Sequence, residues 1–260
     1  MAQPNPVPLR DLFRIDDWLR PALLVTWAVP AARVRPLVPA QLALDTVAGP
    51  DGAPLALLTV AAVLNVGMHP RPLPALRTTC AQANYRTYVR GHDGAPGVYF
   101  FANFVAGRAG WLIPWLLSPH VHYAPARLTG HIPRSATPAA RWDLDLTMRS
   151  PLGPTRITAA GNCDPLTAAA YWLDPATAAR FLSQRLTGYL RDRRGRVWAL
   201  PVDHQEMTPW PGTVSAITCA PWQQWGLLSP AATAQPFSVL LQPAVLFRAY
   251  LPRPAGRRGD

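Results

Sequence analysis

The stretch from Gln82 to Phe101 constrains the fold more than any other part of the chain. Two runs rich in Tyr, Val, Phe and Thr are separated by His92–Gly97, which contains two glycines and a proline. Such runs favour β-strands, and glycine and proline favour the turn between them. The stretch therefore predicts an antiparallel β-hairpin.

The first strand of this hairpin is predicted to have a polar face. Because side chains alternate along a strand, Gln82, Asn84, Arg86, Tyr88 and Arg90 share one side. One interpretation is a solvated outer face, or an arginine stacked on tyrosines. The other is the polar wall of a ligand cavity, in which the forked donors of Arg86 bind an anion.

The pattern of the remaining sequence predicts a mostly β protein with minor α structure. Apolar or alternating segments cover residues 22–29, 55–66, 140–149, 155–160 and 237–250, and the 31 prolines break long helices. A short helix is expected within residues 30–38. Asp174-Pro175 predicts a helix start, and we expect that helix to continue to about Leu190. The strands are expected to close into one antiparallel barrel or sandwich.

One domain is the expected organisation for 260 residues without an internal repeat or a linker. We assign residues 1–17 to an irregular lead-in, 18–250 to the domain and 251–260 to a basic tail. The apolar runs are shorter than the ~20 residues that a membrane span needs. Cys80, Cys163 and Cys219 are few and far apart, which favours a reducing compartment. We expect a cytoplasmic protein without membrane association, and a homo-oligomer is compatible with the sequence.

The sequence lacks the residues and motifs that several kinds of chemistry require. All 25 basic residues are arginines, so no lysine is available for an imine, for covalent pyridoxal phosphate or for a Walker-type phosphate site. Neither a GxSxG nor a GxGxxG motif occurs. We therefore expect no cofactor.

Two pairs of side chains have a spacing that could serve a metal ion. His120 and His122 are two residues apart, as are His204 and Glu206, so each pair shares one face if its segment is a strand. Only His131 is available as a further ligand. We expect separate, hydrogen-bonded histidines and no metal site.

The formal charge of +11 raises the question of nucleic-acid binding. Much of the excess lies in two local arginine runs, residues 191–196 and 248–258. No nucleic-acid-binding motif accompanies them, so we interpret both runs as solvated surface.

Several segments together resemble one known family. They are the segments 30–39 with 44–46, 84–89 with 96–101, 123–127, 181–185 and 201–204. They resemble the uncharacterised YqjF-like domain-of-unknown-function family, which is grouped with the acetoacetate decarboxylase-like superfamily. The resemblance implies an antiparallel β-barrel or cone that encloses a small-molecule cavity, with a few peripheral helices.

The chain also departs from the pattern of the family and superfamily that it resembles. Acetoacetate decarboxylases use a lysine imine, which this chain cannot form. Gln82 and Gln184 stand where the family usually has acidic residues, so hydrogen bonding is kept but a general base is lost.

Three functions remain in view. The first is a barrel that binds a small organic anion, a carboxylate or keto acid. Arg86 would bind its charge, Gln82, Asn84, Tyr88 and Tyr99 would orient it, and His204 or Arg185 would approach from other elements. Arg185 could equally form a surface salt bridge. The second is a lyase, hydratase or cyclase that uses His204 as acid and base without an imine. The third is an arginine-rich interaction or nucleic-acid-binding protein.

Overall fold

The structure, a computed structural model, describes residues 13–107, 121–134, 137, 140–166 and 174–256. Strands dominate this part of the chain, as predicted, and every helix is short. Gly107–Leu117, in which we expected a broken helix or a loop, lies almost wholly outside the described residues.

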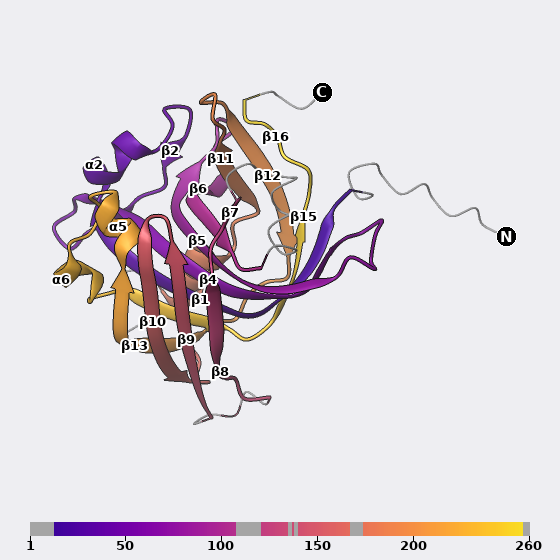
Figure 1. The fold of residues 1–260 in the computed structure, drawn as a ribbon. Coiled ribbons are helices and arrows are strands. Elements are labelled where there is room, and N and C mark those ends of the chain that lie inside the picture. The colour runs from indigo at the N-terminus through magenta and orange to yellow at the C-terminus, as the bar shows by residue number, and fades with distance from the viewer. Residues whose placement is uncertain (1–12, 108–120, 135–136, 138–139, 167–173, 257–260) are drawn as a thin grey trace.

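Seven strands close into a barrel (Figure 1). In their order around the barrel they are β1 (Ile15–Pro30), β4 (Pro54–Pro70), β5 (Thr78–Arg90), β6 (Pro96–Val105), β11 (Thr187–Arg191), β12 (Val197–His204) and β15 (Val245–Ala249). Neighbours are antiparallel except β6 and β11, which are parallel. The predicted barrel is confirmed.

Strand β1 belongs to both layers of the fold. Its first part, Ile15–Leu19, pairs with β15, and its second part, Ala22–Thr26, pairs with β14 (Ser238–Gln242) on the same side. Pro21 lies between the two parts and has no N–H to donate, so the ladder changes partner where one donor is missing. The segment 237–250 was expected to be one strand. It forms two strands, β14 and β15, which pair with different parts of β1.

The second layer is an antiparallel sheet that continues from β14. It consists of β13 (Trp210–Cys219), β10 (Gly153–Asn162), β9 (Arg141–Ser150) and β8 (Ala126–His131). Figure 1 shows these strands crossing in front of β1, β4 and β5. Four strands of two or three residues each pair with one barrel strand. They are β2 (Ala43–Leu44) on β5, β3 (Val47–Ala48) on β4, β7 (Val121–Tyr123) on β6 and β16 (Arg253–Pro254) on β12.

The main hydrophobic core lies between the two layers. Tyr85 of β5 is fully buried there, and its ring packs edge-on against Trp222 at 5.3 Å between centroids. Its hydroxyl forms a hydrogen bond of 2.5 Å with Thr155 Oγ1 of β10, which joins the layers. Trp27 and Trp142 are buried in the same core. These tryptophans therefore serve packing between the sheets.

The helices lie at the periphery. They are α2 (Ala31–Val34), the 3₁₀ turn η1 (Arg35–Leu37), α4 (Pro175–Ser183), α5 (Ala220–Gln224) and α6 (Pro230–Thr233). Within the described residues no helix is long and apolar enough to cross a membrane. The start of α4 is as predicted, because the Asp174 side chain accepts a hydrogen bond of 3.0 Å from the Thr177 amide.

The predicted end of α4 at Leu190 was wrong. The helix ends at Ser183, and Thr187–Arg191 forms β11 between β6 and β12. A helix here would leave one edge of β6 and one edge of β12 without a neighbour and would open the barrel, so sheet closure overrides the helical spacing. Gly188 permits this strand because an added Cβ would come within 2.5 Å of the Phe100 ring.

A buried ion pair holds the end of α4 to the barrel. Arg185 Nη1 lies 2.7 Å from Asp45 Oδ2, and the two side chains are only 5% and 7% exposed. Arg90 donates to the other Asp45 oxygen at 2.9 Å, but its side chain is 51% exposed. The Asp45 carboxylate therefore joins the segment after β2, the end of β5 and the segment after α4.

We expect Asp45→Ala to lower the free energy of unfolding by about 3–5 kcal/mol, because it leaves the buried Arg185 charge without a partner. Arg90→Ala is the matched control and should cost less than about 1 kcal/mol, since water screens the exposed Arg90. Urea unfolding followed by tryptophan fluorescence measures both. Equal, small losses in the two variants would show that the buried pair does not hold α4.

Candidate ligand cavity in the barrel

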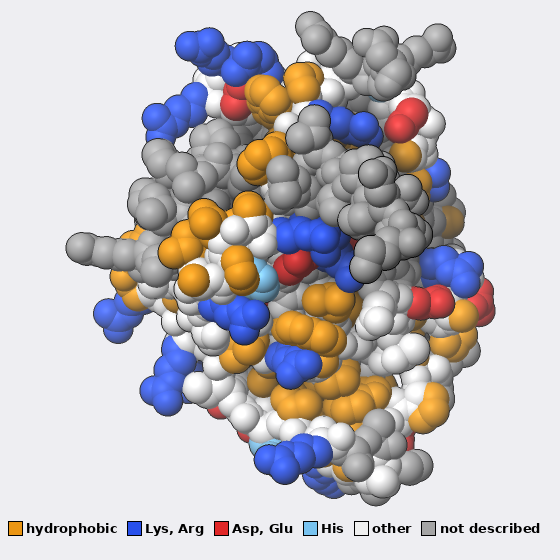
Figure 2. Space-filling view, turned by 90° about the vertical axis from the view of Figure 1, so that its right-hand side faces the viewer, with side chains coloured by type: hydrophobic (Ala, Val, Ile, Leu, Met, Phe, Trp, Pro, Cys, Tyr) orange, Lys and Arg blue, Asp and Glu red, His pale blue; other side chains and the backbone are white. Residues whose placement is uncertain are grey.

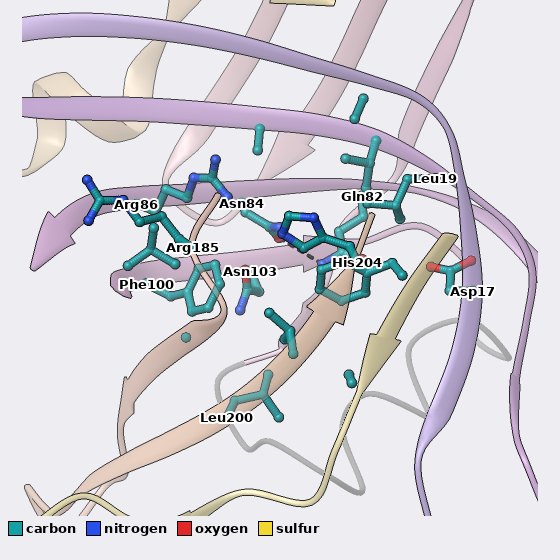
Figure 3. Close-up of a pocket in the computed structure, with 18 of the residues that line it drawn as sticks. Asp17, Leu19, Gln82, Asn84, Arg86, Phe100, Asn103, Arg185, Leu200 and His204 are labelled. Atoms are coloured by element: carbon teal, nitrogen blue, oxygen red, sulfur yellow. Dashed lines mark hydrogen bonds between the residues drawn. The ribbon is translucent and has the colours of Figure 1, made fainter. Parts of the chain in front are cut away.

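A cavity of about 160 Å³ lies inside the barrel. All seven barrel strands contribute to its wall, together with Val121, Ser183, Arg185 and Met207. Most of the lining side chains are apolar, and the polar ones lie on β1, β4, β5, β6 and β12, at the end of α4 and just after it (Figure 3). Among the described residues that line the cavity there is no tryptophan. An apolar cavity with a few converging polar groups is the usual form of a small-molecule site.

Three amide side chains form a hydrogen-bonded row on the cavity wall. Asn65 Nδ2 donates to Gln82 Oε1 at 3.0 Å, and Gln82 Nε2 donates to Asn84 Oδ1 at 2.7 Å. Asn65 Nδ2 also contacts the Cys80 carbonyl at 3.1 Å. Each amide thus fixes the orientation of the next. The row ends at Asn84, whose NH₂ group is left as a donor beside Arg86.

Arg86 brings an uncompensated positive charge to the cavity. Its Nη2 donates to the Leu182 carbonyl of α4 at 3.2 Å, and its Nε is buried without a hydrogen-bond partner. No carboxylate forms an ion pair with it among the residues that the structure describes. A half-buried guanidinium with a buried, unpartnered Nε favours an anion, because an anion would supply both the missing charge and the missing acceptor.

Arg185 also lines the cavity, but it has its partners already. Besides the Asp45 ion pair, its Nε donates to the Phe181 carbonyl at 2.8 Å, and the guanidinium lies over the Phe181 ring at 4.1 Å. The expected surface salt bridge is therefore a buried one. The alternative role as an anion ligand is not supported, because Asp45 neutralises the charge.

The two predicted tyrosines do not line the cavity. Tyr88 is fully buried; its hydroxyl donates to the Leu182 carbonyl at 3.1 Å and lies 2.9 Å from Thr59 Oγ1. Tyr99 pairs with Thr87 and faces the core between the layers, where its ring packs against Phe101 at 5.4 Å. Tyr99 lies on the opposite face of β6 from Phe100, which lines the cavity, so the predicted contact between Tyr99 and a ligand has no support in this cavity and stays an untested prediction.

His204 reaches the cavity from the end of β12. Its Nδ1 lies 2.9 Å from the Gln205 carbonyl, and its ring stacks on Phe247 at 5.9 Å with 12° between the planes. Burial lowers the pKa of His204 below its usual value, and the nearby charge of Arg86 lowers it further. A neutral ring whose Nδ1–H donates to Gln205 keeps the lone pair on Nε2, so His204 is suited to accept a proton.

β12 ends at His204, so His204 and Glu206 do not share one face of a strand. In the described part of the chain no group of three or more possible metal ligands occurs. His120 lies outside the described residues, while His122 packs on Phe104.

Four polar residues of the cavity were missed from the sequence: Asn65, Ser183, Asp17 and Asn103. Asp17 is 4% exposed and Asn103 is 6% exposed, and in each the Oδ1 atom is buried without a hydrogen-bond partner. Burial raises the pKa of Asp17 to about 7, although backbone hydrogen bonds from Val66 and Trp18 oppose the shift. Asp17 was assigned to the irregular lead-in, but β1 begins at Ile15, and alternation with Ile15 and Leu19 was a usable signal. Asn103 follows the hairpin stretch that we analysed.

The arginine run at residues 191–196 is a turn with local partners. Asp192 Oδ2 accepts from Arg196 Nε at 2.7 Å and from Trp198 Nε1 at 3.1 Å. These contacts account for part of the charge in this turn. On the face drawn in Figure 2, the described arginines are scattered among apolar side chains and form no continuous basic stripe. Nucleic-acid binding stays an untested prediction.

The fold is similar to solved structures of acetoacetate decarboxylase-like enzymes. The enduracididine biosynthesis enzyme MppR complexed with pyruvate superposes with a TM-score of 0.60 at 12% identity, over 93% of this chain and 90% of that one. An acetoacetate decarboxylase-like enzyme from Sphingomonas wittichii RW1 gives 0.55 at 12% identity, over 92% of each chain. Acetoacetate decarboxylase from Legionella pneumophila gives 0.52 at 12% identity, over 98% and 91%. At these identities the likeness establishes the fold.

The sequence comparison identifies the family of this chain. No curated protein sequence matches it. The model of the DUF2071 family, described as an uncharacterized conserved protein (COG2071), matches residues 17–245. This confirms the resemblance inferred from the segments between residues 30 and 204. The chain is a member of the DUF2071 family, with an acetoacetate decarboxylase-like fold.

Proposed function

We propose that the barrel binds a small organic anion, a carboxylate or keto acid, in its internal cavity. The observation that carries this proposal is the state of Arg86. Its guanidinium lies at the cavity wall with one carbonyl contact, a buried Nε without a partner and no carboxylate beside it among the described residues. By contrast, Arg185 next to it is fully paired. The neutralised arginine serves the fold, and the other is left for a ligand.

The groups around Arg86 suit the polar part of such a ligand. The amide row ends in a donor at Asn84, close to Arg86 on the same face of β5 (Figure 3). Asn103 on β6 is directly paired with Asn84 in the sheet and offers a second amide. A carboxylate would contact Arg86, and a keto or hydroxyl oxygen next to it would lie within the range of these amides.

Two of the similar structures agree with this ligand class. MppR is described in complex with pyruvate, and also with the condensation product of pyruvate and imidazole 4-carboxaldehyde. Both ligands derive from a small keto acid. In this chain the keto group would stay free of an enzyme imine, because the sequence contains no lysine.

Substituting Arg86 tests the proposal directly. We expect Arg86→Ala to weaken the binding of pyruvate and longer 2-keto acids by about 10- to 100-fold, since a hydrogen bond to a charged group contributes roughly 1.5–3 kcal/mol. Isothermal titration calorimetry of the purified protein measures the change. Arg156→Ala, on the exposed face of β10 in the outer sheet, is the matched control and should bind as the wild type does. Binding that does not depend on Arg86 would refute the proposal.

A second candidate is catalysis with His204 as the acid and base. The specific observation is the bond between Nδ1 and the Gln205 carbonyl, which leaves Nε2 as the proton acceptor at the cavity. A lyase, hydratase or cyclase acting on the bound acid needs one such group. The amides at Gln82 and Gln184 cannot supply it, because an amide does not titrate in this range.

If His204 is the base, activity should fall as the pH decreases through the His204 pKa, which lies below the usual value of 6.5. At pH 7 and above the ring is neutral and the rate should be at its plateau. The measurement is a pH–rate profile on any 2-keto acid that the protein turns over, for the wild type and His204→Gln. We expect the variant to lose the acidic limb and at least about 100-fold in rate. An acidic limb retained in His204→Gln would assign it to another group.

A further inference from the structure

The cavity has a second polar end, which the proposed function does not use. Figure 3 shows Arg86 at one end of the drawn side chains, His204 in the middle and Asp17 at the other end. All three line the same cavity, from β5, β12 and β1 respectively. A ligand that contacts only Arg86 would leave the Asp17 end unoccupied.

The sheet register gives the spacing of the two ends. Arg86 is paired with Thr59 on β4, whereas Asp17 lies between Asp16 and Trp18, which pair with His69 and Val66 of the same strand. The positions are therefore at least seven residues apart along β4, or roughly 23 Å at about 3.3 Å per residue. The side chains of Arg86 and Asp17 bridge part of this distance. The remaining span is too long for pyruvate.

Asp17 is in an unusual state for a carboxyl group. It is 4% exposed, its Oδ1 has no hydrogen-bond partner, and no cationic side chain pairs with it among the described residues. The neighbouring Asp16, in contrast, pairs with Arg14 at 2.7 Å. A buried acceptor without a partner is costly, and a ligand that donates a hydrogen bond would remove that cost. Burial raises the pKa of Asp17, against the opposing backbone hydrogen bonds from Val66 and Trp18.

The wall between the two ends combines the amide row and His204 with apolar side chains. Leu19, Ala22 and Val63 line it from β1 and β4, and Leu200 and Phe247 line it from β12 and β15. One water needs about 10–15 Å³ of such a cavity, so 160 Å³ accommodates roughly a dozen non-hydrogen atoms. An unbranched hydrocarbon chain fits the volume of the cavity and the apolar side chains of its wall.

We propose that the ligand is a linear, two-ended organic acid. Its carboxylate contacts Arg86, a chain of roughly eight carbons lies along the apolar wall, and a terminal hydroxyl or ammonium group donates to Asp17. This inference rests on the proposed function for the Arg86 end and adds the length of the ligand and the chemistry of its other end.

The test compares three acids of equal length by calorimetry: octanoate, 8-hydroxyoctanoate and 8-aminooctanoate. We expect wild-type protein to bind the two substituted acids at least about 10-fold more tightly than octanoate. Asp17→Asn should keep the hydroxy acid within a few-fold but lose at least 10-fold for the amino acid, because an amide accepts a hydrogen bond without carrying charge. Asp17→Leu should reverse the order and favour octanoate.

Asp16→Asn is the matched control, because Asp16 does not line the cavity, and it should leave the order of the three acids unchanged. Thermal unfolding of each variant identifies any that fails to fold, in which case the comparison of acids on the wild type and on Asp17→Asn decides. Octanoate binding as tightly as the substituted acids, with no effect of Asp17→Asn, would overturn the two-ended ligand. If that binding still depends on Arg86, the proposed function stands; if no acid binds in an Arg86-dependent way, it falls as well.

Discussion

The whole molecule depends on the double pairing of β1. On one side this strand follows β4 along almost its entire length, and on the other it is divided between β15 and β14. The pairing with β15 closes the barrel and so creates an interior. The pairing with β14 leads into the outer sheet and so gives the outside of the barrel an apolar surface to bury against. Without this one strand, neither layer would be complete.

Because the fold has two layers, one face of a barrel strand can pack in the core while its other face lines the cavity. On β5 the side chains that point outward, such as Tyr85, bury their rings in the core between the sheets. Their neighbours Gln82, Asn84 and Arg86 point inward without loss of core packing. Because the stability of the fold comes mainly from the layer interface, the interior can remain partly empty and carry unpaired polar atoms. This division explains why a chain so rich in tryptophan has a cavity lined by smaller residues and arginine.

Sequence reasoning recovered what depends on local alternation. The hairpin, its polar face, the mostly β composition and the family were all predicted, because each follows from residue types at short spacing. The errors arose where pairing with distant strands decides the outcome. The segment after Ser183 has helical spacing but is recruited as a strand between β6 and β12. Likewise, no local signal distinguishes Arg185, which pairs with an aspartate 140 residues away, from Arg86, which pairs with no carboxylate in the part of the chain that the structure describes.

The carbonyl of Leu182, in the last turn of α4, accepts hydrogen bonds from both Arg86 and Tyr88. The position of the helix end and the direction of the guanidinium are thus linked through one oxygen atom. By thermodynamic reciprocity, an occupant that draws Arg86 away must change the docking free energy of α4, and displacement of α4 must change the affinity of the cavity by the same factor. Occupancy of the barrel interior is therefore coupled to the docking of a short peripheral helix. The rate of amide hydrogen exchange in α4 should change when the cavity is occupied, whatever the ligand is.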